Sequence, residues 1–223
     1  DVVINHRKTL TNWVDFPKET YQGKTYQLLS TDICKDDCGG QTASWAAANG
    51  YALSNNNDTG EGVTFARDLD HNSANVQKNV KAYLHFLLND MGYAGVRYDM
   101  VKGYAGKFTG IYNAAVRPAF SVGEYWDGNV SKVKTWVDGT GKTSAAFDFP
   151  MKYLIKAAFG GSDWSKLSYY NTTNASYSSL AGQNGYSQYA VTFVDNHDTG
   201  EPHANPDPLR ANIAAANAYI LAM

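Results

Sequence analysis

Short apolar runs and stretches of helical hydrophobic spacing alternate along this chain. The strongest helical signal covers residues 75–91, where apolar side chains recur every three or four positions and fall on one face. Asn72 or Ser73 can cap the start of this helix, and Gly92 suits its end. Further helices are predicted over three segments: 107–117, 150–160 and 208–222. Strands are predicted over five: 1–6, 94–98, 119–123, 145–149 and 189–195.

This alternation predicts βα units and a parallel sheet. Two segments interrupt it. Residues 7–72 are polar, rich in Gly, Asn, Asp and Thr, and have no sustained period, and residues 171–188 form a polar loop. A stretch as long as 7–72 is rarely structureless in a compact domain, so we expect an inserted subdomain there. A bound metal ion is a candidate for holding it in shape.

Composition narrows the possible functions. The 223 residues are enough for one large domain or two small ones. The formal net charge of −2 gives a nucleic-acid partner no electrostatic support. No run is long and apolar enough to span a membrane. The chain begins within an apparent strand and ends after a helix-like run, so we expect it to be part of a longer protein.

The only two cysteines, Cys34 and Cys38, lie close together in DICKDDCGG. A bridge across so short a span needs a tight turn. A zinc site needs two further ligands, and none is obvious nearby. A local disulfide and two free thiols therefore stay equally open.

Three acidic residues each follow a short apolar run: Asp99, Glu124 and Asp198. If the runs are parallel strands of one sheet, all three carboxylates emerge at the same end of it, where α/β enzymes place their catalysts. Arg97 lies two residues before Asp99 and so points to the same face of its strand. A guanidinium favours the ionised carboxylate, which can act as a nucleophile in glycosyl transfer. The alternative is a structural Arg–Asp pair.

The neighbours of Glu124 and Asp198 favour two other roles. The aromatic residue Trp126, close to Glu124, can restrict solvent and raise a carboxyl pKa, as a general acid needs, and can stack on a sugar. The alternative is an exposed loop glutamate. In DNHD, His197 can bind substrate hydroxyls and Asp198 can oppose the positive charge of an oxocarbenium ion. The alternative there is a polar turn that caps a helix.

Oxygen-bearing side chains around the polar segment indicate a cation site. Asn5 offers an amide oxygen, and Asp58 and Asp68 offer carboxylates. This donor set suits Ca²⁺ better than zinc. Solvated loop acids are the alternative, and spacing alone does not decide between them.

Four motifs, DVVINH, GVRYDMVKGY, VGEYW and FVDNHD, occur in this order and resemble the four signature regions of the α-amylase family, glycoside hydrolase family 13. ARDLDH resembles a further short region in the subdomain that this family inserts into its barrel. The resemblance is closest to plant-type α-amylases and their bacterial relatives, and it covers essentially the whole chain. Arg67 stands where the family usually has proline.

The resemblance implies a (β/α)₈ TIM barrel, here incomplete and holding about strands three to seven. Residues 1–6 and 73–223 would form the partial barrel, and residues 7–72 the inserted calcium-binding subdomain. Asp99 matches the nucleophile, Glu124 the general acid/base and Asp198 the transition-state stabiliser. The matching substrate contacts are His6, Arg97, Lys102, Trp126 and His197. The matching calcium ligands are Asn5, Asp58, Glu61, Asp68 and Gly103, with Glu61 and Gly103 contributing carbonyl oxygens.

The implied activity is endo-acting, retaining hydrolysis of α-1,4-glucosidic bonds in starch or glycogen. The alternatives are a maltooligosaccharide-forming amylase, a glucan transglycosylase, or an inactive fragment that only binds glucan. We expect a monomer with an α-glucan substrate and neither a nucleic-acid nor a membrane partner. The family implies an extracellular or periplasmic location, because starch is too large to enter cells.

Overall fold

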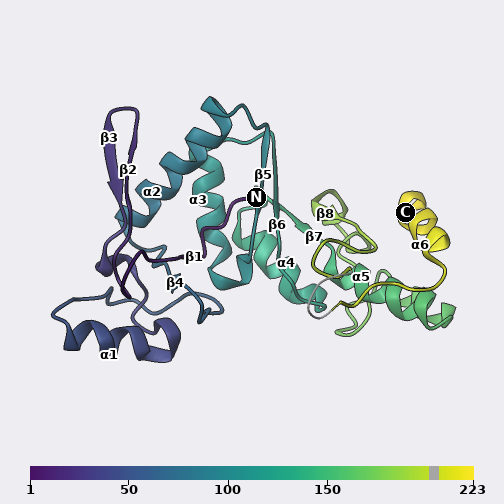
Figure 1. Ribbon diagram of the computed structural model, residues 1–223. Helices are drawn as coiled ribbons and strands as arrows, with labels where there is room; N and C mark the ends of the chain where they lie inside the picture. The colour runs from purple at the N-terminus through teal and green to yellow at the C-terminus, as the bar shows by residue number, and fades with distance from the viewer. Residues whose placement is uncertain (201–205) are drawn as a thin grey trace. The chain divides into compact units, whose positions relative to one another are not determined.

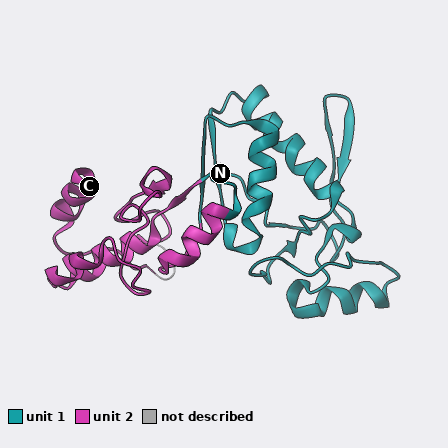
Figure 2. Ribbon diagram, turned by 180° about the vertical axis from the view of Figure 1, so that it is seen from behind, with its two compact units in different colours: residues 1–124, 139–144 teal, residues 125–138, 145–223 magenta. Residues whose placement is uncertain are grey.

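The computed structural model describes residues 1–200 and 206–223 (Figure 1). The chain divides into two compact units, shown in separate colours in Figure 2. Unit 1 contains residues 1–124 and 139–144, and unit 2 contains residues 125–138 and 145–223. This division by compactness differs from the domains expected from the family, which stay a prediction.

Unit 1 is built around two adjacent parallel strands and two helices. Its elements are β1 (His6–Arg7), β2 (Lys18–Tyr21), β3 (Lys24–Gln27), α1 (Gln41–Ala48), β4 (Arg67–Asp68), α2 (Ala74–His85), β5 (Gly95–Tyr98), α3 (Gly106–Val116) and β6 (Phe120–Gly123). Strands β5 and β6 pair in parallel, from Gly95 opposite Phe120 to Tyr98 opposite Gly123. The strands predicted over 94–98 and 119–123 are confirmed.

Helix α2 confirms the strongest hydrophobic pattern of the sequence. The Ser73 hydroxyl accepts hydrogen bonds from the backbone N–H groups of Asn75 and Val76, which makes it the N-cap. Val76 and Leu84 are fully buried on the apolar face of the helix. A wider helical turn, Phe86–Asp90, continues α2, and the helix predicted over 107–117 is α3. The two helices pack against each other.

The strand predicted over residues 1–6 is only partly present. Val2 forms an isolated parallel bridge with Tyr98, whereas β1 pairs antiparallel with β4. The prediction of one continuous strand is therefore wrong. The segment changes partner within a few residues, and the Asn5 carbonyl already accepts from the N–H of Leu69 beside β4.

The polar segment 7–72 contains helices and strands that its sequence did not predict. Strands β2 and β3 form a hairpin, and Gln22 and Gly23 at its tip both have positive φ, as a tight turn of this hand requires. Both cysteines of the segment are buried free thiols. Of the two alternatives for Cys34 and Cys38, the structure therefore has free thiols.

Unit 2 holds a second pair of parallel strands with helices. Its elements are α4 (Val130–Gly139), whose last residue falls in unit 1, β7 (Ala145–Phe147), α5 (Phe149–Ile155), β8 (Ala190–Val191) and α6 (Ile213–Ala222). The predicted strand over 189–195 is wrong in length, because only Ala190 and Val191 pair with β7. Helix α4 was not predicted, although it buries Val130, Val133 and Val137 at helical spacing. Among residues 1–200 and 206–223, no helix has the length and apolar character needed to cross a bilayer.

The core of unit 2 forms where α5 and the wider helical turn that continues it, Lys156–Gly160, pack against residues that follow β8. Its buried members are Met151, Ile155, Ala158, Phe159, Val194, Leu209 and Ala216. Removing these apolar surfaces from water is the main favourable contribution to packing here. The core thereby fixes α5 and the polar loops above it.

A buried carboxylate, Asp148, organises this unit. It caps α5 by accepting from the N–H of Met151, and it also accepts from the N–H groups of Leu180 and Ala181. Its side chain is completely buried, and burial raises its pKa to about 6. The three donors offset part of that cost, so one side chain joins α5 to a loop more than thirty residues away.

We expect Asp148→Ala to destabilise the chain by about 2–4 kcal/mol, because a helix cap is lost and buried N–H groups lose their acceptor. Urea unfolding followed by circular dichroism measures the change. Asp163→Ala, at an exposed carboxylate of the same unit, is the matched control and should leave the unfolding midpoint almost unchanged. Equal midpoints for the two variants would contradict the structural role of Asp148.

Candidate active site

Arg97 joins two of the predicted catalytic carboxylates within unit 1. Its guanidinium lies 2.5 Å from Asp99 Oδ1 and 2.8 Å from Glu124 Oε1. It also approaches the Asp1 carboxylate at 3.3 Å. The structure thus brings Arg97, Asp99 and Glu124 together, as the sequence predicted. The Arg97–Asp99 pair is not isolated, because the same cation also contacts Glu124, and the catalytic roles of the two acids stay a prediction.

The parallel register of β5 and β6 explains this convergence. Asp99 follows β5 and Glu124 follows β6, and the Glu124 N–H donates to the carbonyl of Tyr98 at 2.9 Å. Adjacent parallel strands deliver the residues after their last pair to the same edge. Met100 then adopts a left-handed conformation with φ of 49°, and its N–H donates to Glu124 Oε2 at 3.1 Å. Both carboxylate oxygens of Glu124 therefore have a fixed partner.

The environment of Glu124 suits a group that must carry a proton. Its side chain is only 6% exposed. Burial raises its pKa, and the nearby Asp99 carboxylate adds to that effect, while the Met100 N–H and Arg97 act in the opposite direction. The alternative of an exposed loop glutamate is wrong.

Two predicted substrate contacts, His6 and Lys102, belong to unit 1. His6 packs edge-on against the ring of Phe65, and burial lowers its pKa, an effect that Asp99 partly opposes. The Lys102 ammonium lies 2.8 Å from Glu61 Oε1. Lys102 therefore contacts the polar segment 7–72, and its contact with substrate stays a prediction.

Two of the predicted metal ligands share a small cavity. Asp58 and Asp68 line a hollow of about 240 Å³ together with Asp36 and Cys38. Asp58 Oδ2 is buried and has no hydrogen-bond partner. Burial raises the pKa of Asp58, and it raises that of Asp68 to about 7 even though Asp68 accepts from the Val63 N–H. An unpartnered carboxylate oxygen beside a second buried carboxylate fits a bound cation.

The three other predicted ligands lie at neighbouring points of the fold. Pairing of β1 with β4 places Asn5 beside Asp68. Gly103 leaves room for the Asn5 amide, since a β-carbon there would lie 2.0 Å from Asn5 Oδ1. The Glu61 N–H donates to the Lys102 carbonyl, next to Gly103. In the part of the chain that the structure describes, no three His, Cys, Asp or Glu side chains form a metal-binding group, so any site here would also rely on amide and carbonyl oxygens.

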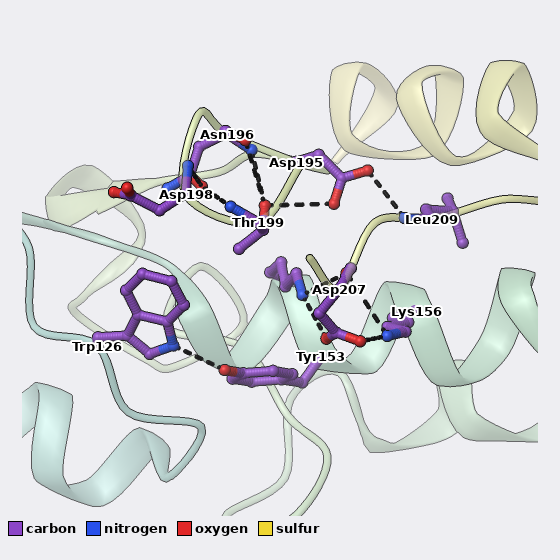
Figure 3. Close-up of polar contacts among 10 residues, drawn as sticks. Trp126, Tyr153, Lys156, Asp195, Asn196, Asp198, Thr199, Asp207 and Leu209 are labelled. Carbon is purple, nitrogen blue, oxygen red and sulfur yellow. Dashed lines mark hydrogen bonds and ion pairs between the residues drawn. The ribbon is translucent and has the colours of Figure 1, made fainter. Parts of the chain in front are cut away.

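Asp198, His197 and Trp126 belong to unit 2. The N–H groups of Asp198 and Thr199 both donate to Asn196 Oδ1, so the predicted alternative of a polar turn is present in the backbone (Figure 3). His197 Nε2 lies 3.0 Å from Asp198 Oδ2, with the imidazole largely exposed. That Asp198 shares one cavity with Asp99 and Glu124 stays a prediction.

Trp126, in unit 2, has partners that the sequence did not indicate. The Trp126 ring stacks on Phe149 with centroids 4.8 Å apart, and its Nε1–H donates to the Tyr153 hydroxyl at 2.8 Å (Figure 3). The ring remains 36% exposed. One turn of α5 therefore supports the face of Trp126. The only sign of this contact in the sequence is the four-residue spacing of Phe149 and Tyr153, which places them on the same face of a helix.

Comparisons with known proteins agree with the motifs. No family model matches the chain. A probable α-amylase 2 from Arabidopsis thaliana is 29% identical over 236 residues, which cover 99% of this chain and 52% of that protein. An α-amylase from Bacillus licheniformis is 31% identical over 157 residues, covering 67% of this chain and 28% of that protein. The chain thus spans about half the length of the plant relative and less of the bacterial one.

Comparison with solved structures also finds an α-amylase. The structure of an α-amylase from Malbranchea cinnamomea superimposes with a TM-score of 0.54 over 88% of this chain and 38% of that one, at 19% identity. At this identity the likeness speaks for the fold alone. The sequence is thus similar to those of plant and bacterial α-amylases, and the fold is similar to that of the α-amylase from Malbranchea cinnamomea.

Proposed function

We propose that the protein hydrolyses internal α-1,4-glucosidic bonds of starch or glycogen with retention of configuration. The observation that carries the proposal is the shared contact of Arg97 with Asp99 and Glu124 at the ends of adjacent parallel strands. A cation between two carboxylates allows one to act as a nucleophile while the buried one carries a proton. The similarity to α-amylases supports the choice of an α-glucan substrate.

The chemistry follows from the two acids. Asp99 attacks the anomeric carbon and forms a covalent glycosyl ester, while Glu124 gives its proton to the departing glycosidic oxygen. Glu124, now a carboxylate, then takes a proton from water, which attacks the same carbon and releases Asp99. This double displacement requires carboxyl groups about 5–5.5 Å apart. Asp198 would oppose the charge of the oxocarbenium-like transition state, and His6, Lys102, Trp126 and His197 would hold the sugar.

We further propose that Ca²⁺ binds the inserted segment through Asp58, Asp68, the Asn5 amide oxygen and the carbonyls of Glu61 and Gly103. The unpartnered Asp58 oxygen and the raised carboxyl pKa values support this assignment. The ion would supply positive charge between the carboxylates and tie the segment to β1 and the loop after β5. The partial barrel of strands three to seven, the monomeric state and the extracellular or periplasmic location stay predictions.

In the full-length protein, we expect Asp99→Asn to lower kcat on soluble starch at least about a thousandfold, because the nucleophile is lost. Glu124→Gln should lower it at least about a hundredfold, because proton transfer is lost. Asp90→Asn, at an exposed carboxylate of the same unit, is the control. Near-normal activity of Asp99→Asn would refute the nucleophile assignment, and uniform short products or transfer products would favour the maltooligosaccharide-forming or transglycosylase alternatives.

Loss of the Arg97 guanidinium should change how kcat/KM depends on pH. Arg97 lowers the pKa of Glu124, so Arg97→Gln should raise it further. Glu124 would then keep its proton to higher pH, and the alkaline limb of kcat/KM should move upward while the maximum falls by roughly tenfold or more. Arg7→Gln, which breaks the exposed Arg7–Glu19 pair, should change neither. A downward shift of the limb would contradict the role of Glu124 as the acid.

Calcium binding predicts a change in stability. Addition of Ca²⁺ to the chelated protein should raise the unfolding temperature, since an ion at about a hundred times its Kd adds roughly 2.7 kcal/mol to the free energy of unfolding. Asp58→Asn should abolish the response, whereas Asp90→Asn should retain it. Differential scanning calorimetry with EGTA or Ca²⁺ measures the effect. An unfolding temperature of the unsubstituted protein that ignores both reagents would refute the site.

A further inference from the structure

A buried lysine on α5 contacts the segment that follows the Asp198 loop. The Lys152 ammonium donates to Asp207 Oδ2 at 2.8 Å and to the Asp207 carbonyl at 3.1 Å. The lysine side chain is 1% exposed, while that of Asp207 is 46% exposed. Lys156, one turn further along, contacts the same carboxylate. A helix that packs in the core of unit 2 therefore holds Asp207 through charge-assisted hydrogen bonds.

Asp207 in turn holds one end of the loop that carries Asp198. Its N–H donates to the carbonyl of Thr199 at 2.8 Å. A second bond ties the other end, since the N–H of Leu209 donates to Asp195 Oδ2 at 2.9 Å (Figure 3). The loop is thus attached to the segment after it on both sides of Asp198.

The inside of the loop is equally constrained. Asn196 Oδ1 accepts from the N–H groups of Asp198 and Thr199, and the Asn196 N–H donates to the Thr199 hydroxyl at 2.9 Å. These three hydrogen bonds fix the local shape of the loop. Its position relative to α5 then depends on the contacts of Asp207 and Leu209.

The ammonium of Lys152 carries a cost that calls for an explanation. Its burial lowers its pKa, and the neighbouring Asp195 and Tyr153 oppose that change. An apolar side chain of similar length would fill the same space without desolvating a charge, and buried ion pairs are often no more stable than such replacements. The charge instead allows Lys152 to donate to both the carboxylate and the carbonyl of Asp207, which an apolar side chain could not do.

We propose that Lys152 and Asp207 are positioning residues that hold the 195–199 loop so that Asp198 faces the substrate. The inference rests on the proposed function, in which Asp198 stabilises the transition state. Neither residue needs to touch the sugar. A displacement of a catalytic group by about 1 Å can lower the rate about a hundredfold. Loss of the Lys152–Asp207 contact should therefore change kcat measurably, even though neither residue touches the sugar.

The test compares Lys152→Met, Asp207→Asn and the double variant in the full-length protein. We expect Lys152→Met to lower kcat on soluble starch about tenfold to a hundredfold with KM changed by less than about twofold. The double variant should be no slower than the worse single variant, because each substitution already breaks the Lys152–Asp207 ion pair. Lys166→Met, which removes the half-buried partner of the exposed Asp163 carboxylate, is the matched control.

Amide hydrogen exchange gives a readout that does not depend on activity. In Lys152→Met, the amides of Asp198, Asp207 and Leu209 should exchange about tenfold faster, while those of Leu180 and Ala181, held by Asp148, should not change. Unchanged exchange, an unchanged kcat, or additive effects in the double variant would overturn the inference. If Lys152→Met does not fold, Asp207→Asn alone decides by the same measurements. An unsubstituted protein that does not hydrolyse glucan would instead overturn the proposed function, and exchange would still decide whether the tether holds the loop.

Discussion

The contact that the candidate site depends on is the guanidinium of Arg97 between two carboxylates. Two acids that emerge side by side from parallel strands repel each other, and burial of one makes its ionised form costly. Arg97 relieves the repulsion, and the Met100 N–H holds the second oxygen of Glu124. Arg97 thereby holds the two acids close together at the ends of β5 and β6.

A second buried ion pair lies in the polar segment 7–72. Arg67 is buried and pairs with Asp37 at 2.8 Å, while its guanidinium lies 4.6 Å over the ring of Trp13. The Asp68 N–H donates to the other oxygen of Asp37. The Arg67–Asp37 pair thus supports β4 and, with it, the carboxylate of Asp68. Asp58 Oδ2 lacks such a protein partner, which is why a cation fits there.

The sequence predicted the parts of the fold whose periodicity is unambiguous. Helix α2 and strands β5 and β6 lie where apolar spacing put them, and the grouping of Arg97, Asp99 and Glu124 followed from parallel strands. The strand at residues 1–6 was predicted too long. The segment changes its pairing partner from β5 to β4, and an apolar run looks the same in sequence whichever strand it pairs with. The tether through Lys152 and Asp207 joins residues fifty-five positions apart, and no local pattern reports such a contact.

The two buried thiols of the polar segment 7–72, Cys34 and Cys38, affect how the protein reacts with thiol reagents. Cys34 is 1% exposed, and its burial, together with the surrounding aspartates, raises its pKa far above the usual range. The Cys38 S–H points to the carbonyl of Thr64 at 3.4 Å. Only the thiolate reacts with alkylating reagents, so Cys34 is inert while it stays buried, and burial also shields Cys38 from a reagent. The rate at which they become labelled would accordingly measure how often this region opens.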